Sequence, residues 1–523
     1  MEGLVTKYNM TLEGLLPLFQ KRSKSSYIVA AILLIIVKQI YSFFRVPTNL
    51  RHFPSVSFFA MAKSLLTSEP PYSRFKRIIL PAIQEGNGFY VSKVPVDWTV
   101  YITNPVAAKQ LLLKSNSFPK SHCVFDIVGD KHPAIQFVGR DSVVLSNGEV
   151  WKKQRKIMNP VFHRSMPIKT VASLIPLFFS AIEEANGRIP IKPRMKDFTL
   201  DALGLTIFDF EFKALQGDPD HWTLAYKLVI QSIFDPISSV FSALEPLLVY
   251  IYPKRRRSAD AVAKLNAKFD QVISKKREEI QNGIFSNKPD NEKDLVTLML
   301  EAGMQEDISI TNEELRHNMA VLFLAGDDNI SNALSFCLYH LAKNKRAQQK
   351  LREEIINILG DDDMDIVPSL EELKQMKYMD MVIKENLRHN MPVDLLIPRK
   401  TIEDTFVADT FIPKDTRIAV DVGALHRDPR SWKDPDEFVP ERFEDDGEQK
   451  DHEGLTWVPF SNGTRQCIGM NFSLMEQRLV LTMLLRKYEV DLPKDSIHYD
   501  HIIYENPTYI CPDSLELIFT KRY

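Results

Sequence analysis

The chain has 523 residues, of which 44% are hydrophobic and 26% are charged, so it is long enough to bury a large core. Its formal net charge of −2 argues against a surface built mainly to bind nucleic acid. The four cysteines, at positions 123, 337, 467 and 511, form no Cys-x-x-Cys pair and no disulfide framework. We therefore expect the folded part to lie in a reducing compartment.

The N-terminal part contains a long apolar run. Residues 27–37 (YIVAAILLIIV) are uninterrupted, and Ile40–Phe44 extends the run to about 18 residues if Lys38 reaches the membrane interface. A signal peptide and a buried helix are the alternatives, although no small-residue cleavage site follows. We expect an uncleaved anchor helix over residues 27–44. A short segment, residues 1–26, precedes the anchor, and one folded domain, residues 45–523, follows it.

A long helix is predicted near the middle of the chain. Thr311 and Glu314 form a capping box, and no proline follows as far as Lys343. At 1.5 Å per residue, such a helix is a rod of roughly 46 Å. A rod of that length must run through the middle of the molecule.

Other patterns predict further helices and a few short strands. Ser369 and Glu372 form a second capping box, for a helix that runs to about Arg388. Residues 283–294 (GIFSNKPDNEKD) read as an exposed loop between two helical patterns, and Thr416–Val422 reads as a short strand. The predicted class is mostly α with small β-sheets.

Cys467 lies in a polar, glycine-rich stretch, residues 460–469 (FSNGTRQCIG). A helical pattern begins at Ile468, so the thiol is expected at a helix N-terminus, where free amides favour a thiolate. No histidine in this loop can serve as the base of a catalytic thiol, although a distant histidine stays possible. A thiolate can also ligate iron, with glycines that let the backbone approach a flat ligand and with Arg465 ready to pair with a carboxylate.

The pattern F-x-x-G-x-R-x-C-x-G resembles the haem-ligand signature of the cytochrome P-450 superfamily, and Phe460, Gly463, Arg465, Cys467 and Gly469 fill its fixed positions. The resemblance implies the cytochrome P-450 fold and heme b (iron protoporphyrin IX) as cofactor. It implies Cys467 as the axial ligand of the iron, with Phe460 and Arg465 beside the haem. Residues 45–523 would then form a haem-thiolate monooxygenase domain.

Two further motifs extend the resemblance. Glu385 and Arg388 in ENLR match the E-x-x-R helix of the family, and at this spacing they share one helix face. Arg442 in PERF would complete a buried charge network behind the haem, which we expect to fix geometry more than to add stability. The run HRDPRSWKDPDEFVPERF, residues 426–443, resembles fungal and other eukaryotic microsomal members, and we expect a fungal type.

Three basic residues match positions that hold the haem propionates in the family. WKKQR resembles the W-x-x-x-R motif, which implies that Trp151 and Arg155 reach a propionate. An amphipathic basic helix is the alternative reading of WKKQR. Arg399 falls where many relatives place another propionate partner. Together with Arg465, these cations would neutralise two carboxylates that are costly to bury alone.

The predicted central helix departs from the family in its oxygen-binding motif. Relatives show A/G-G-x-D/E-T-T/S, whereas residues 325–330 read AGDDNI, with Asn329 in place of the customary threonine. The resemblance implies that Asn329 hydrogen-bonds dioxygen or holds a water and that Asp328 connects the site to solvent. Both are candidate catalytic residues. Alternatively, Asn329 only satisfies the backbone where the helix loosens at Gly326.

The position of each motif implies a mostly apolar substrate pocket, which suits a lipophilic steroid, fatty acid, terpenoid or xenobiotic. Asp394 would be its polar member. Residues 234–257, apolar and then basic, are consistent with a lid that touches the membrane, or with core packing. The pocket residues are Phe125, Val128, Ala325, Val393, Asp394 and Leu395.

The resemblance implies hydroxylation with O₂ and with electrons from a partner, because the chain has no Gly-rich dinucleotide motif of its own. An NADPH-cytochrome reductase at the endoplasmic reticulum membrane is the expected donor, with the catalytic domain cytosolic. Residues 151–156, Arg478, Arg486 and Lys487 could receive its acidic flavin domain, although each could equally be a solvated charge. A haem-thiolate isomerase or dehydratase, or a non-catalytic haem-binding protein, is the alternative function.

Overall fold

The computed structural model describes residues 24–523 apart from residues 94–96, 123–129, 131, 165, 218–220, 234, 236, 238–243, 307, 507–508 and 513. The chain divides into two compact units, Met1–His52 and Phe53–Tyr523. In the first unit, helix α2 (Lys24–Phe44) exposes its apolar side chains and is a candidate membrane span by length and composition.

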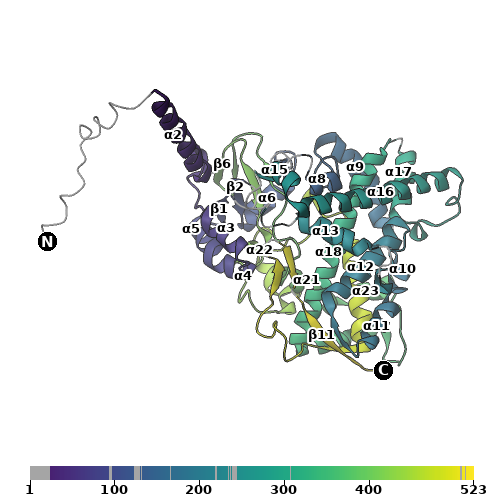
Figure 1. The fold of residues 1–523 in the computed structure, drawn as a ribbon. Coiled ribbons are helices and arrows are strands. Elements are labelled where there is room, and N and C mark those ends of the chain that lie inside the picture. The colour runs from purple at the N-terminus through teal and green to yellow at the C-terminus, as the bar shows by residue number, and fades with distance from the viewer. Residues whose placement is uncertain are drawn as a thin grey trace. The chain divides into compact units, whose positions relative to one another are not determined.

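The second unit is mostly helical (Figure 1), as predicted. Its helices are α3 (Phe58–Leu66), α4 (Pro71–Arg74), α5 (Leu80–Glu85), α6 (Pro105–Leu113), α8 (Pro133–Val138), α9 (Gly148–Arg164), α10 (Ile168–Ala172), α11 (Ile175–Glu184), α12 (Ile191–Leu203), α13 (Trp222–Ile233), α15 (Glu245–Ile251), α16 (Pro253–Gln281), α17 (Leu295–Gln305), α18 (Asn312–Lys343), α19 (Lys345–Leu359), α20 (Leu370–Gln375), α21 (Lys377–His389), α22 (Val422–Leu425) and α23 (Met470–Lys487).

Small sheets complete the second unit. A four-stranded sheet has the order β1-β2-β7-β4, and its parallel pair sets Val100 opposite Ile418, both fully buried. The other sheets have the orders β3-β11-β8, β5-β6 and β10-β9. The strands are β1 (Phe89–Ser92), β2 (Thr99–Ile102), β3 (Arg188–Pro190), β4 (Arg399–Lys400), β5 (Thr405–Val407), β6 (Thr410–Ile412), β7 (Arg417–Val420), β8 (Tyr488–Asp491), β9 (Tyr504–Asn506), β10 (Tyr509–Pro512) and β11 (Glu516–Lys521).

Helix α18 confirms the predicted central rod. Thr311 caps it by accepting the N–H of Glu314, whose carboxylate accepts the N–H of Thr311 at 2.9 Å. Figure 1 shows α18 among α12, α13, α21 and α23, and side chains from all of them join one apolar core. This packing buries most of the helix, above all its C-terminal half from Ile330 to Ala342.

The second capped helix is shorter than predicted. Ser369 and Glu372 do form a capping box, but the helix stops at Gln375, and a new one, α21, begins at Lys377. The prediction of one helix up to Arg388 was therefore wrong. The carboxylate of Glu354, on α19, accepts the first free N–H groups of α21, from Tyr378 at 2.7 Å and Met379 at 2.9 Å. This tertiary contact starts the new helix, and local sequence carries no sign of it.

Candidate active site

Cys467 lies between a short helical turn, η9 (Gly463–Arg465), and the long helix α23. Its N–H donates to the carbonyl of Phe460 at 2.9 Å, which closes the loop. Helix α23 begins at Met470, two residues later than predicted, because Ile468 and Gly469 form a turn. The thiol is still presented just before a helix N-terminus.

The surroundings of the thiol act on its protonation in opposite directions. The side chain is accessible, yet the enclosing protein removes enough water to raise the pKa of Cys467, while the Gly469 N–H and Arg155 oppose the rise. A coordinated metal ion reverses the balance, since it deprotonates a ligating thiol outright. The loop thus suits a metal-bound thiolate better than a free reactive thiol.

Gly463 fixes where this loop lies. Its φ of +70° favours glycine, and a Cβ atom there would lie 2.7 Å from the carbonyl oxygen of Leu112, near the end of α6. The hydroxyl groups of Ser115 and Thr464 hydrogen-bond at 2.8 Å across the same contact. Residues 111–118 therefore form one wall against which the loop is seated.

The predicted propionate partners come together near this loop. Arg465 lies over the ring of Trp151 at 3.9 Å and donates to the carbonyl of Ser146 at 2.9 Å. Arg155 donates to the carbonyl of Gln466 at 3.1 Å, and Arg399 donates to the carbonyl of Leu111 at 3.2 Å. The structure thus places Trp151, Arg155, Arg399 and Arg465 around one region.

These cations lack an acidic partner among the described residues. The Nε atom of Arg155 and the Nη2 atom of Arg399 are buried without a hydrogen-bond acceptor. Burial lowers the pKa of Arg399 to about 10. The pKa of Arg465 is also lowered to about 10, first by burial and then by the positive charges of Arg399 and Arg155. Such uncompensated cations are costly in a folded protein. They fit a ligand with two carboxylates, as heme b has.

Sequence reasoning missed Lys120, a fourth cation of this group. Its backbone bridges Arg399 in antiparallel fashion, which brings the two side chains to the same region. Burial, with Arg399 and Arg465 close by, lowers the pKa of Lys120 to about 7. No motif marks Lys120, because only the pairing with Arg399 brings it here.

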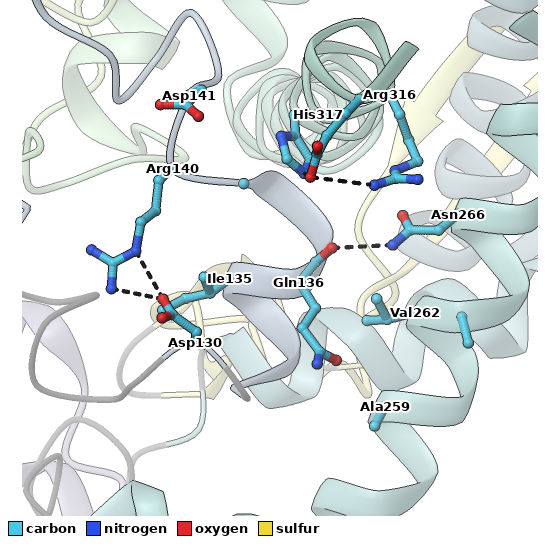
Figure 2. A pocket seen from close by; sticks show the side chains of 13 residues that line it. Asp130, Ile135, Gln136, Arg140, Asp141, Ala259, Val262, Asn266, Arg316 and His317 are labelled. Carbon is cyan, nitrogen blue, oxygen red and sulfur yellow. Dashed lines mark hydrogen bonds and ion pairs between the residues drawn. The ribbon is translucent and has the colours of Figure 1, made fainter. Parts of the chain in front are cut away.

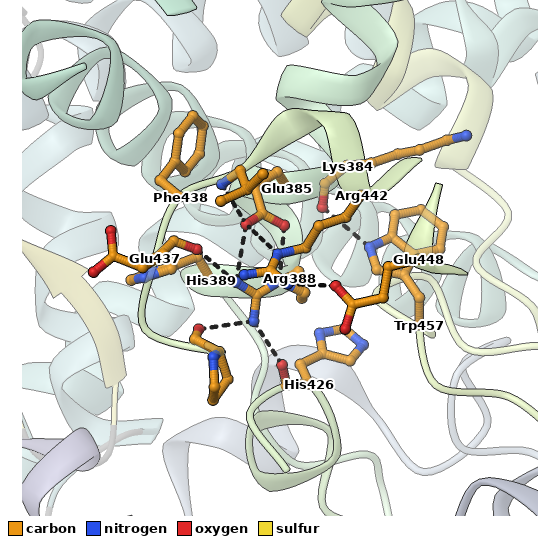
Figure 3. Close-up of polar contacts among 12 residues, drawn as sticks. Lys384, Glu385, Arg388, His389, His426, Glu437, Phe438, Arg442, Glu448 and Trp457 are labelled. Carbon is orange, nitrogen blue, oxygen red and sulfur yellow. Dashed lines mark hydrogen bonds and ion pairs between the residues drawn. The ribbon is translucent and has the colours of Figure 1, made fainter. Parts of the chain in front are cut away.

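The predicted charge network is present and buried (Figure 3). Glu385 and Arg388 form a two-pronged ion pair with distances of 2.7 and 2.9 Å, and Arg442 approaches Glu385 at 3.4 Å. Arg388 also donates to the carbonyl of His426 at 2.9 Å, and Arg442 pairs with Glu448. Each charge therefore has partners, which is the condition for burying it.

Helix α18 is accessible at one place in its interior. Every residue from Asn318 to Ala342 is buried except Leu324, Ala325, Gly326 and Asn329. Ala325 and Asn329 are one turn apart, so they share a face. An open space must border this turn. Ala325 and Asn329, which are predicted for the substrate and oxygen site, both face it.

Asp328 points elsewhere, into a buried polar cluster. Its carboxylate accepts from Lys196 at 2.9 Å and from the hydroxyl of Tyr226 at 2.6 Å. Lys192 lies 3.8 Å from the same carboxylate and donates to Ser331 at 3.1 Å. The side chain of Lys196 is 19% exposed and that of Asp328 is 3% exposed, so Lys196 links the cluster to solvent.

The remaining predicted pocket residues are scattered. Phe125 and Val128 lie outside the described residues. Val393 is exposed, and Leu395 packs against the apolar cluster beside the four-stranded sheet. Burial raises the pKa of Asp394, which Arg74 opposes, so this carboxyl belongs to a cluster with Arg74.

A separate cavity of about 560 Å³ lies between α8, α16 and the first turns of α18 (Figure 2). Its lining is mostly polar, and its cations are already paired: Arg140 with Asp130 at 2.8 Å, and Arg316 with Asp270 at 3.0 Å. It contains none of the residues predicted for the haem or the substrate.

Known proteins match this chain over most of its length. The sequence matches the cytochrome P450 family over residues 84–503. Cytochrome P450 3A29 of Sus scrofa is 30% identical over 67% of this chain and 69% of its own length. Cytochrome P450 4d2 of Drosophila melanogaster is 28% identical over 67% of this chain and 72% of its own length. Taurochenodeoxycholic 6 alpha-hydroxylase of Sus scrofa is 27% identical over 75% of this chain and 76% of its own length.

The fold comparison agrees. The crystal structure of the cytochrome P450DA heme domain has a TM-score of 0.75 and 21% identity, and the match covers 90% of this chain and 98% of that one. Relatives from insects, plants, mammals and a fungus all match, so the expected fungal type is not supported. The chain belongs to the cytochrome P450 family and is a monooxygenase with heme b as its cofactor.

Proposed function

We propose that this monooxygenase hydroxylates a lipophilic small molecule at the accessible turn of α18, and that Cys467 would hold the haem iron. The observation that carries the proposal is the pair of accessible surfaces, at Ala325 with Asn329 and at Cys467, inside an otherwise buried core. When bound, the haem supplies the activation of dioxygen for insertion of one oxygen atom into a C–H bond.

The cations around the loop would hold the cofactor. Arg155, Arg399, Arg465 and Lys120 have free donors or lowered pKa values, both of which two propionates would relieve. Trp151 supports Arg465 by stacking. Phe460 closes the loop through its carbonyl.

Asp328 and Asn329 would share the handling of protons. Asn329 offers amide donors and an acceptor on the accessible face, where it would orient dioxygen or a water. Asp328 holds a proton position between Lys196, which reaches solvent, and Tyr226. A proton from solvent can thus reach the helix without crossing the apolar core.

The proposal includes a source of electrons and a location in the cell. A membrane-bound NADPH-dependent reductase is the proposed donor, and α2 is the proposed single anchor in the endoplasmic reticulum membrane. Lys152 and Lys156 are each 59% exposed and could meet an acidic partner. Arg486, also expected to do so, is buried and donates to backbone carbonyls, which rules it out.

The described part of residues 234–257 supports contact with a membrane. Leu247, Tyr250 and Ile251 are exposed on α15. Arg255, in contrast, is fully buried and pairs with Asp235 at 3.2 Å, so it is part of the core. The proposed lid therefore offers its apolar side chains, together with the remaining basic residues, to the lipid surface.

A spectral experiment tests the ligand. The reduced, CO-bound protein is expected to absorb at the long-wavelength Soret position typical of the family, and Cys467→Ser is expected to abolish that band. Survival of the band in the variant would show that another residue ligates the iron.

A substrate screen tests the reaction. Steroids come first, because one relative is named as a bile-acid hydroxylase, and fatty acids follow. Binding spectra select ligands, and turnover with reductase and NADPH should then give an oxygen-dependent product. Product without NADPH would favour the isomerase or dehydratase, and binding without any product would favour a haem-binding protein.

A further inference from the structure

Asn147 lies immediately before α9, at a position where asparagine usually caps a helix with its side chain. Its backbone carbonyl accepts the N–H of Trp151 at 3.4 Å, as at the start of a helix. Among the described residues, however, its side chain makes no hydrogen bond to α9. The side-chain amide bonds to Lys120 and Arg465 instead. Asn147 therefore connects the start of the helix to two distant segments.

The amide of Asn147 holds the backbone of Lys120 by two hydrogen bonds. The N–H of Lys120 donates to Oδ1 at 2.9 Å, and Nδ2 donates to the carbonyl of Lys120 at 3.0 Å. On the other side of this segment, the backbone of residues 119 and 121 pairs with that of residues 398 and 400 at 2.9 Å. Asn147 and β4 thus fix Lys120 opposite Arg399 from both sides.

The same amide holds the guanidinium of Arg465. Oδ1 of Asn147 accepts from Nη2 of Arg465 at 3.2 Å, and the carbonyl of Ser146 accepts from Nη1 at 2.9 Å. The ring of Trp151 covers the guanidinium at 3.9 Å. The segment that begins α9 therefore sets the direction of Arg465.

The charges of these cations work against their own arrangement. After burial, the positive charges of Arg399 and Arg465 lower the pKa of Lys120, and those of Arg399 and Arg155 lower the pKa of Arg465. Cations that repel one another keep a fixed geometry only if other groups hold them. An amide can do so because it offers both a donor and an acceptor and carries no charge. A carboxylate at the same place would neutralise Arg465 itself.

We propose that Asn147 is a positioning residue of the haem site, whose single amide directs both Lys120 and Arg465 toward the two haem propionates. The inference rests on the proposed haem site. Asn147 acts through the two cations and does not itself contact the haem. Through the pairing of Lys120 with Arg399, the same amide also steadies the third cation.

Two properties of the holoprotein depend on this arrangement. Well-placed cations retain the propionates through charge-assisted hydrogen bonds. Cations beside a haem also favour its reduced form, because reduction adds a negative charge to the haem. Loss of the amide should therefore weaken haem retention and lower the midpoint potential.

Asn147→Leu, made in the full-length holoprotein, tests the inference. Haem transfer to an excess of apomyoglobin should become at least several-fold faster, and the midpoint potential should fall. A variant with the rate and the potential of the wild type would overturn the proposal.

Asn344→Leu is the matched control. Asn344 is also a partly buried asparagine that begins a helix, α19, and its amide accepts the N–H of Ala347 at 3.0 Å and donates to the carbonyl of Phe438 at 3.4 Å. This variant should lose stability but keep the haem transfer rate and the potential of the wild type. The same changes in both variants would reduce the effect of Asn147 to a general loosening of the fold and overturn the proposal.

Double variants test whether Asn147 acts through the two cations. In an Arg465→Met background, Asn147→Leu should accelerate haem transfer much less than it does in the wild type, and the same should hold in a Lys120→Met background. Effects that simply multiply in either pair would overturn the claim that one amide serves both cations.

If Asn147→Leu does not fold, Asn147→Asp takes its place, since the two side chains have nearly the same shape. The carboxylate can still accept from Lys120 and Arg465, but it would pair with Arg465 in place of a propionate. Haem transfer should again be faster and the potential lower, and wild-type values would overturn the proposal. Failure of the proposed haem site is distinguishable, since Arg465→Met and Lys120→Met would then themselves leave both properties unchanged.

Discussion

Arg399 is a buried cation with one unused hydrogen-bond donor. One of its guanidinium nitrogens, Nη2, is buried without an acceptor, while the other, Nη1, is held by the carbonyl of Leu111. A propionate at this place would form a charge-assisted hydrogen bond.

We expect Arg399→Met to weaken haem retention by roughly 10- to 100-fold, since hydrogen bonds to charged groups contribute about 1.5–3 kcal/mol. The rate of haem transfer to an excess of apomyoglobin measures the change. Arg194→Met, which alters a partly exposed arginine paired with Asp197, is the control and should leave the rate unchanged. Equal rates for all three proteins would show that Arg399 does not contact the haem.

His426 carries a prediction about acid stability. It is fully buried, and its Nε2 atom accepts the N–H of Val458 at 2.9 Å, so a proton on that nitrogen would break the bond. Burial, with Arg388 close by, lowers the pKa of His426 to about 3. Because the unfolded histidine protonates near pH 6.5, the stabilisation is complete above that pH and is lost progressively as the pH falls from about 6.5 towards 3.

In His426→Gln, the amide oxygen can still accept from Val458 and cannot titrate. Between pH 7 and pH 5, the wild type should therefore lose about 2 kcal/mol more unfolding free energy than the variant, at about 1.4 kcal/mol per pH unit below pH 6.5. Guanidinium unfolding at both pH values measures this. His221→Gln, at an exposed position, should behave like the wild type. An equal loss in wild type and His426→Gln would mean that His426 titrates alike in the folded and unfolded chains.

At the scale of elements, the Cys467 loop depends on Gly463. Gly463 and Gly148 both have a positive φ, +70° and +57°, but only Gly463 has a carbonyl 2.7 Å from the place of a Cβ, while Gly148 has nothing within 4 Å. A side chain at Gly148 would meet backbone strain alone, whereas a side chain at Gly463 would meet backbone strain and a steric clash.

Gly148→Ala should cost only the left-handed backbone strain, about 1–2 kcal/mol of unfolding free energy. Gly463→Ala should cost more and should also shift the Soret band of the CO complex, because the loop must move away from Leu112. Unfolding and spectra of both variants provide the comparison. Equal costs and an unmoved band would show that the contact with α6 does not position the thiol.

The buried charge network joins α21 to the segment before the Cys467 loop. Arg388→Met should cost about 3–5 kcal/mol of unfolding free energy, because it leaves Glu385 buried with less compensation. Arg316→Met, at a partly exposed pair, should cost about 1 kcal/mol or less. Denaturant unfolding of the holoprotein measures both losses of free energy. Similar losses in the two variants would mean that the buried network stabilises the fold no more than a surface pair does.

Sequence reasoning succeeded where the signal is local. The capping boxes of α18 and α20 and strand β7 depend on residues a few positions apart, and the structure has each of those elements. It failed where distant segments meet. Glu354 interrupts the helix at Met376, and Lys120 joins the cations through β4.

At the scale of the whole molecule, the two compact units predict separable properties. Removal of residues 2–44 takes away α2 but none of the residues proposed to contact the haem or the substrate, and none of the buried charge network. The shortened protein should therefore keep its reduced CO spectrum and bind liposomes less than the full chain. Flotation with liposomes and a spectral titration measure the two properties. Loss of the spectrum would show that the apolar helix is needed for folding.

The stretch from Leu111 to Phe118 touches three residues of the proposed haem site. Its carbonyls meet Arg399 and Gly463, and Ser115 bonds to Thr464, a residue 349 positions later. A loop exchange in this stretch, made to alter the surface, would therefore change the colour and the redox potential of the enzyme. Engineers who redesign substrate entry should leave these eight residues as a fixed frame.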